Sequence, residues 1–111
     1  MAVSKAGLPG KTSDRPIIAL APLAGITDLP FRNAVSRFGA DFVVSEMVAS
    51  QDMVHARPGT RDKALVGEGG DTPTAVQLAG REARWMAEAA KIAEDQGAQI
   101  ITSTWAARPR R

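Results

Sequence analysis

The residues of this chain that could bind a ligand or take part in catalysis lie at or near the ends of its apolar segments. A tight turn of small residues lets a flat ligand approach the backbone, and a carboxylate anchors a ligand or accepts a proton. A side-chain amide offers both a donor and an acceptor to the edge of a heterocycle. The alternative is that such polar groups are solvated residues at loop edges. The residues in question are Pro22, Leu23 and Ala24 in the turn, the carboxylate of Glu46 and the amide of Gln77.

Other candidate groups favour a structural role. His55 is the only histidine, and we interpret it as a surface residue rather than a general acid. Trp85 is expected in the core, because apolar residues at helical spacing surround it. Scattered arginines are usual on a surface, although they could also meet phosphates; they are Arg32, Arg37, Arg57 and Arg61.

Four short apolar segments are predicted to be strands that position the site. They lie at residues 17–21, 42–47, 74–79 and from 98 to at least 101. The first is an apolar run without alternation, as expected for a strand covered on both faces. Glu46 and Gln77 lie near the ends of the second and third segments. All the site residues would therefore meet at one rim of a parallel sheet or barrel.

Helices are predicted between these strands. Thr27 or Asp28 caps the first helix, and Gly39 ends it. A short helix is expected over 48–55, a helical turn over 62–66 and a long helix over 82–96. Apolar positions mark one face of the first helix, at Phe31, Val35 and Phe38, and one face of the long helix, at Trp85, Ala89, Ile92 and Ala93.

Alternating strands and helices predict an α/β fold with right-handed connections and a parallel sheet. The first strand is not followed by G-x-G-x-x-G, which argues against a dinucleotide-binding Rossmann site.

Composition indicates one small domain of 111 residues without cysteine, which excludes disulfides and thiolate metal sites. The net charge of +2 depends on three arginines near the C-terminus, so the rest of the chain is not basic. We expect residues 1–15 to be a disordered segment, and we expect no metal, no membrane span and a cytoplasmic location.

The chain resembles the N-terminal part of a bacterial tRNA-dihydrouridine synthase of the B type. Four motifs in order carry this resemblance, which runs from about residue 17 to residue 101. They are the stretch Ala21–Arg32 (APLAGITDLPFR), the stretch Val44–Met47 (VSEM), the stretch Val76–Gly80 (VQLAG) and the stretch Ala93–Ala98 (AEDQGA).

The resemblance implies an FMN-binding TIM (β/α)8 barrel followed by a helical RNA-binding domain. A TIM barrel takes about 250 residues. Residues 16–101 would supply only its first three βα units and the start of a fourth strand, a partial barrel. The implied reaction reduces uridine in tRNA to 5,6-dihydrouridine, with NADPH as the source of electrons, FMN as the hydride donor and a cysteine as the acid. The intact family enzyme is expected to be a monomer.

Carried over by position, Pro22, Leu23 and Ala24 would line the flavin, Gln77 would hydrogen-bond its ring, and Glu46 would lie on the substrate side. The cysteine would fall at Ala107, so we expect no catalytic residue in this chain and an inactive fragment. Two alternatives stay open. One is another FMN barrel of the dihydroorotate dehydrogenase type, and the other is a small RNA-binding protein without catalysis.

Residues 102–111 depart from the family pattern. The family continues Asp-Ile-Asn-Met-Gly-Cys-Pro-Ala-Lys-Lys, whereas this chain has Thr-Ser-Thr-Trp-Ala-Ala-Arg-Pro-Arg-Arg. The family segment can be written in GC-rich codons. When the first base of its Asp codon is deleted, the shifted frame translates as Thr-Ser-Thr-Trp-Ala-Ala-Arg-Pro-Arg, followed by Arg or Ser. We therefore expect 102–111 to be a frameshifted tail.

Overall fold

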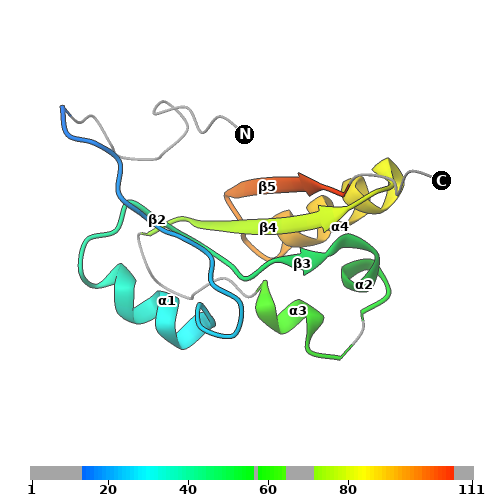
Figure 1. The fold of residues 1–111 in the computed structure, drawn as a ribbon, viewed down its shortest axis with the longest axis horizontal. Helices are drawn as coiled ribbons and strands as arrows, with labels where there is room; N and C mark the ends of the chain where they lie inside the picture. Colours follow the sequence, from blue (N-terminus) through cyan, green and yellow to red (C-terminus); the bar gives the residue numbers. More distant parts are fainter. Residues whose placement is uncertain (1–13, 57, 65–71, 107–111) are drawn as a thin grey trace.

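An open parallel sheet, with helices between its strands, makes up the fold of this chain (Figure 1). The structure, a computed structural model, describes residues 14–56, 58–64 and 72–106. The strands are β1 (Ala19–Leu20), β2 (Phe42–Val44), β3 (Val48–Ala49), β4 (Thr74–Gly80) and β5 (Ile100–Trp105). The helices are α1 (Leu29–Ser36), α2 (Ser50–Val54), α3 (Thr60–Lys63) and α4 (Ala83–Asp95).

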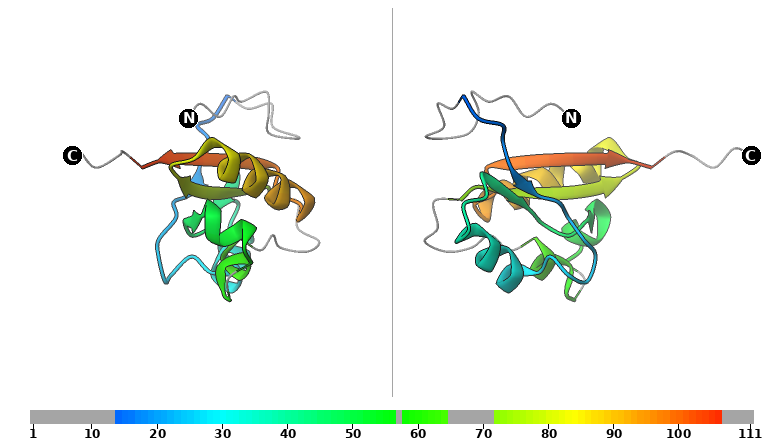
Figure 2. Two further views of the ribbon diagram at one scale, coloured as in Figure 1. Left: turned by 90° about the vertical axis from the view of Figure 1, so that its right-hand side faces the viewer. Right: turned by 60° about the vertical axis from the view of Figure 1, so that its left-hand side comes forward.

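Strand β4 is the centre of the sheet. Strand β2 pairs with its first half and β3 with its second half, while β1 pairs with the far side of β2. Strand β5 runs along the opposite side of β4 over its full length, and both turned views show the two side by side (Figure 2). Every pair is parallel, which confirms the predicted parallel sheet.

A β-bulge interrupts the strand that was predicted as one segment over 42–47. Val44 pairs with Ala75 and Val48 pairs with Leu78, so three residues on one strand face two on the other. The extra residue breaks the ladder and bends the strand. The segment therefore forms β2 and β3 rather than one strand, and the helix predicted over 48–55 shortens to α2.

The core lies between one face of the sheet and helices α2 and α4. From β4 it takes the buried side chains of Val76 and Leu78, which lie on the same face because the side chains of a strand have a period of two. They contact the apolar face of α4, where Ala89 and Ala93 are buried as predicted. Other members of this core are Val48, Met53, Ala64, Met86 and Ala98. A side chain from each helix lies against Gly80, where an added Cβ would collide with Ser50 Oγ and Met86 Sδ.

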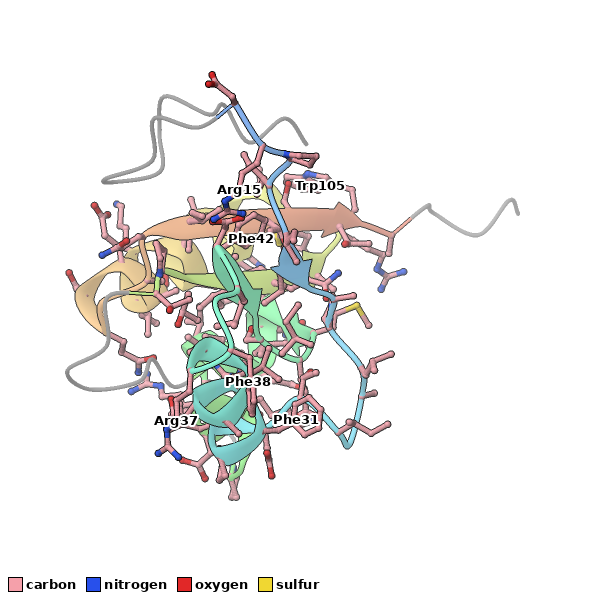
Figure 3. The ribbon with its side chains drawn as sticks, turned by 90° about the vertical axis from the view of Figure 1, so that its left-hand side faces the viewer. Arg15, Phe31, Arg37, Phe38, Phe42 and Trp105 are labelled. Atoms are coloured by element: carbon pink, nitrogen blue, oxygen red, sulfur yellow. The ribbon has the colours of Figure 1, made fainter. Side chains whose placement is uncertain are left out.

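Helix α1 begins as predicted but buries a different face. Asp28 is its N-cap, with Oδ1 accepting a hydrogen bond from Phe31 N–H at 3.0 Å. The predicted apolar face is wrong: Phe31 is 40% exposed and Phe38 is 90% exposed, and Figure 3 shows both rings on the surface of α1. Arg32 is buried instead. Main-chain carbonyls lie on that side of the helix, and they need a donor that phenyl rings lack.

The first strand is shorter and less covered than predicted. Only Ala19 and Leu20 pair with β2, and Ile18 is 61% exposed. Before this strand, the side chain of the buried Asp41 accepts the main-chain hydrogen bond that a neighbouring strand would otherwise accept. It accepts hydrogen bonds from Ile18 N–H at 2.7 Å and from both Nη atoms of Arg15 at 2.8 and 3.0 Å. Arg15 is thus held in place, although it falls in the segment predicted to be disordered; residues 1–13 lie outside the described residues.

The remaining elements agree with the sequence within a few residues. Helix α3 begins two residues before the helical turn predicted over 62–66, and residues 65 and 66 are not described. Helix α4 lies within the predicted 82–96. Strand β5 continues through Thr102, Ser103 and Thr104 to Trp105, because Thr and Trp favour extended backbone.

Candidate functional site

The turn after β1 is a loop over residues 23–27 that is closed by its own hydrogen bonds. The N–H groups of Ile26 and Thr27 both donate to Leu23 O at 3.0 Å. The buried Thr27 hydroxyl accepts from Leu23 N–H at 2.9 Å and donates back to Leu23 O at 3.1 Å. Gly25 has φ +74°, a conformation that side chains disfavour. We call this segment the 23–27 loop.

Glu46 anchors the 23–27 loop from the neighbouring strand. Its Oε1 accepts a hydrogen bond from Gly25 N–H. Glu46 lies in the bulge between β2 and β3, and the bulge sets the direction of its side chain. Two features that the sequence placed at one rim are therefore in direct contact.

Ser45 connects the bulge to Gln77. Its N–H donates to Ala75 O at 2.8 Å, its Oγ accepts from Gln77 N–H at 3.1 Å, and the same hydroxyl donates to Glu46 O at 3.0 Å. A hydroxyl thus replaces the backbone carbonyl that the bulge displaces. The 23–27 loop, Glu46, Ser45 and Gln77 form one hydrogen-bonded wall.

Gln77 lies further from the end of its strand than predicted. Strand β4 ends at Gly80, and Gln77 pairs with Thr102 of β5 in the middle of the ladder. Because side chains alternate along a strand, Gln77 lies on the face opposite the buried Val76 and Leu78. The core helices α2 and α4 pack on that other face, so the half-buried amide of Gln77 lies on the side of the sheet away from them.

The three turn residues present an accessible surface on the same wall. Pro22 is half-buried, Leu23 is 49% exposed and Ala24 is exposed. The exposed leucine and alanine and the half-buried proline suit the flat face of an aromatic ring, and the Gln77 amide suits a ring edge. The residues present thus fit a flavin ring.

Sequence reasoning missed Arg32 as part of this wall. Its side chain is 1% exposed, Nε donates to Thr27 O at 3.1 Å, and Nη2 donates to Lys63 O at 3.3 Å. Burial lowers the pKa of the guanidinium, and the carboxylates of Glu46 and Asp28 oppose that change. The only signal in the sequence was the spacing Asp28–Arg32, one helical turn.

A hollow with a volume of about 280 Å³ lies at the C-terminal end of β4. Ser50, Gly80, Glu82 and Trp85 are among its lining residues. The exposed His55 packs edge-on against Trp85 at 5.0 Å between ring centroids, in agreement with its prediction as a surface residue. Trp85, predicted in the core, is only partly buried because it lines this hollow.

The described residues contain no group of three or more His, Cys, Asp or Glu placed to hold a metal ion. No helix within the described part of the chain is long and apolar enough to cross a membrane.

Comparison with known proteins identifies the family. The family model described as "Dihydrouridine synthase (Dus)" matches residues 19–102. A probable tRNA-dihydrouridine synthase of Rhodobacter capsulatus is 63% identical over 86 residues, which are 78% of this chain and 26% of that protein. The corresponding protein of Rhizobium leguminosarum is 57% identical, over 76% of this chain and 26% of its own length. The tRNA-dihydrouridine synthase B of Pseudomonas putida is 46% identical over 83% of this chain and 27% of its own length.

The chain thus spans about a quarter of the length of the curated relatives it matches. No solved structure matches it significantly. The parallel sheet agrees with the first part of a (β/α)8 barrel, the fold of the matched family, as the sequence resemblance predicted. With three quarters of its residues matched by the family model, the chain is a member of the dihydrouridine synthase family.

Proposed function

We propose that this chain forms one wall of a flavin site for the reduction of uridine to 5,6-dihydrouridine in tRNA. The observation that carries the proposal is the hydrogen-bonded wall, in which the 23–27 loop, Glu46 and Gln77 are joined through Ser45. The family match favours this function over a dihydroorotate dehydrogenase or a small RNA-binding protein. We propose tRNA as the partner and the cytoplasm as the location.

Different residues of the wall would contact different parts of the flavin. Pro22, Leu23 and Ala24 would contact the face of the ring, and the Gln77 amide would hydrogen-bond its edge. Bound FMN would supply the hydride for the C5–C6 bond, with NADPH as the source of electrons. Glu46 holds the loop through Gly25 N–H and would lie on the substrate side of the ring.

We further propose that this chain does not complete the reaction by itself. The resemblance assigns protonation of C5 to a cysteine, and this chain contains none. The position of that cysteine is Ala107, outside the described residues. General acid catalysis typically contributes about 10²- to 10⁴-fold to a rate. The purified chain, given FMN, NADPH and unmodified tRNA, should form no measurable dihydrouridine.

Flavin binding tests the proposal directly. FMN is titrated into the full chain and binding is followed by the change in flavin fluorescence. Gln77→Leu removes the amide and should weaken binding about tenfold, the value of one hydrogen bond at the upper end of its range. Gln99→Leu changes an exposed glutamine outside the wall and should leave binding unchanged. Absence of FMN binding by the wild-type chain, or equal affinity in Gln77→Leu, contradicts the proposed site.

We also infer that residues 102–111 arose by a frameshift. The family match ends at residue 102, where the recoded family segment begins to reproduce this chain. The DNA of the gene decides the matter. An uninterrupted frame of this chain, with no Asp-Ile-Asn-Met-Gly-Cys segment in a neighbouring frame, is incompatible with the inference.

A further inference from the structure

Arg32 is buried, and removing its positive charge from water costs free energy. It is 1% exposed, and arginine is almost never fully buried unless it is paired. Arg37, the C-cap of the same helix, is exposed, which is the ordinary placement of an arginine. Something in the structure must therefore offset the burial of the Arg32 guanidinium.

The contacts of Arg32 join two segments that are far apart in the sequence. Nε donates to Thr27 O, at the last residue of the 23–27 loop, and Nη2 donates to Lys63 O, at the end of α3. Both acceptors are main-chain carbonyls, so the planar guanidinium acts as a fixed bridge between them. Lysine, with one nitrogen at its tip, cannot reproduce both directions.

Two carboxylates offset the charge. Asp28, the cap of α1, and Glu46 in the bulge both interact favourably with the guanidinium. Glu46 also accepts from Gly25 N–H. The 23–27 loop is thus held from two sides, by Arg32 at Thr27 and by Glu46 at Gly25.

We propose that Arg32 is a positioning residue of the cofactor wall, which fixes the 23–27 loop for flavin binding and ties it to α3. The inference rests on the proposed flavin site for its ligand but not for its structural part. It predicts that changing Arg32 weakens FMN binding, although Arg32 itself makes no contact with the ring.

Amide hydrogen exchange in the full chain tests the structural part. In Arg32→Met the amides of Ile26 and Thr27 should lose about tenfold or more in protection, the value of a hydrogen bond to a charged group. The amide of Val76 in β4 should lose less. Arg32→Lys should give an intermediate loss and carries the test if Arg32→Met does not fold. Arg37→Met is the matched control and should change neither.

Wild-type protection at Ile26 and Thr27 in these variants overturns the proposal. So does a loss in strict proportion to that at Val76, because it would report general destabilisation only.

FMN titration then tests the link to the ligand. Arg32→Met should raise the Kd for FMN about tenfold and Arg32→Lys should raise it by a smaller factor, whereas Arg37→Met should leave it unchanged. An unchanged Kd in Arg32→Lys, with a loosened loop, overturns the functional part of the proposal. If the wild-type chain binds no FMN, the proposed function fails, and hydrogen exchange still decides whether Arg32 holds the loop.

Discussion

At the scale of single residues, small polar side chains build the candidate site. Ser45 replaces a missing main-chain acceptor in the bulge, and Thr27 closes the 23–27 loop with its hydroxyl. Both side chains are fully buried, so each hydroxyl must find its partners within the protein. The geometry of Glu46 and Gln77 depends on these neighbours.

Ser45→Ala should lower the free energy of unfolding by about 1–3 kcal/mol, because Gln77 N–H loses its acceptor inside the sheet. Urea denaturation measures the change. Ser103→Ala, at an exposed position of β5, is the matched control and should stay within about 0.5 kcal/mol of wild type. An equal stability of Ser45→Ala and Ser103→Ala would show that the hydroxyl does not support the bulge.

At the scale of elements, caps and bulges decide where the segments begin and end. Asp28 stops the loop and starts α1, and Gly39, with φ +92°, allows the turn that ends it. The bulge between β2 and β3 lets one segment pair with both halves of β4 and directs Glu46 toward the loop. The site therefore depends on an irregularity of the strand rather than on its regular part.

Loss of the N-cap in Asp28→Ala should by itself lower the free energy of unfolding by about 1 kcal/mol. Because Asp28 also offsets the charge of Arg32, the loss should exceed that of a cap alone. Thermal and urea unfolding check the value. Asp95→Ala, at the C-terminal end of α4, serves as the control: removing an acidic group there should be neutral or slightly stabilising. A stability of Asp28→Ala equal to wild type argues against the cap.

At the scale of the whole molecule, the sheet is open at β5. Among the described residues β5 pairs with β4 alone, and its six residues carry no charge and no proline. An uncharged edge strand is a template for pairing with another chain. Trp105, 55% exposed, adds apolar surface at the end of this strand.

We therefore expect the chain to associate as its concentration rises, and Thr104→Lys to reduce this association by placing a charge on the edge strand. Light scattering over a dilution series gives the mass. Asn33→Lys adds the same charge on an exposed position of α1, away from β5, and should associate like wild type. A wild-type chain that remains monomeric over the series, or equal association in both variants, contradicts this prediction.

The sequence by itself determined the order of strands and helices, the parallel sheet, the cap at Asp28 and the family, because periodicity, capping residues and motif spacing are local properties of the chain. It also identified the turn, Glu46 and Gln77 as belonging together. Only the tertiary structure decided how they meet. The one-residue bulge, the burial of Arg32 rather than Phe31 and Phe38, and the bond from Gly25 to Glu46 arise from hydrogen bonds between residues 5 to 32 positions apart. No local pattern encodes them, because the partner of each polar group comes within hydrogen-bonding distance only after the strands have paired.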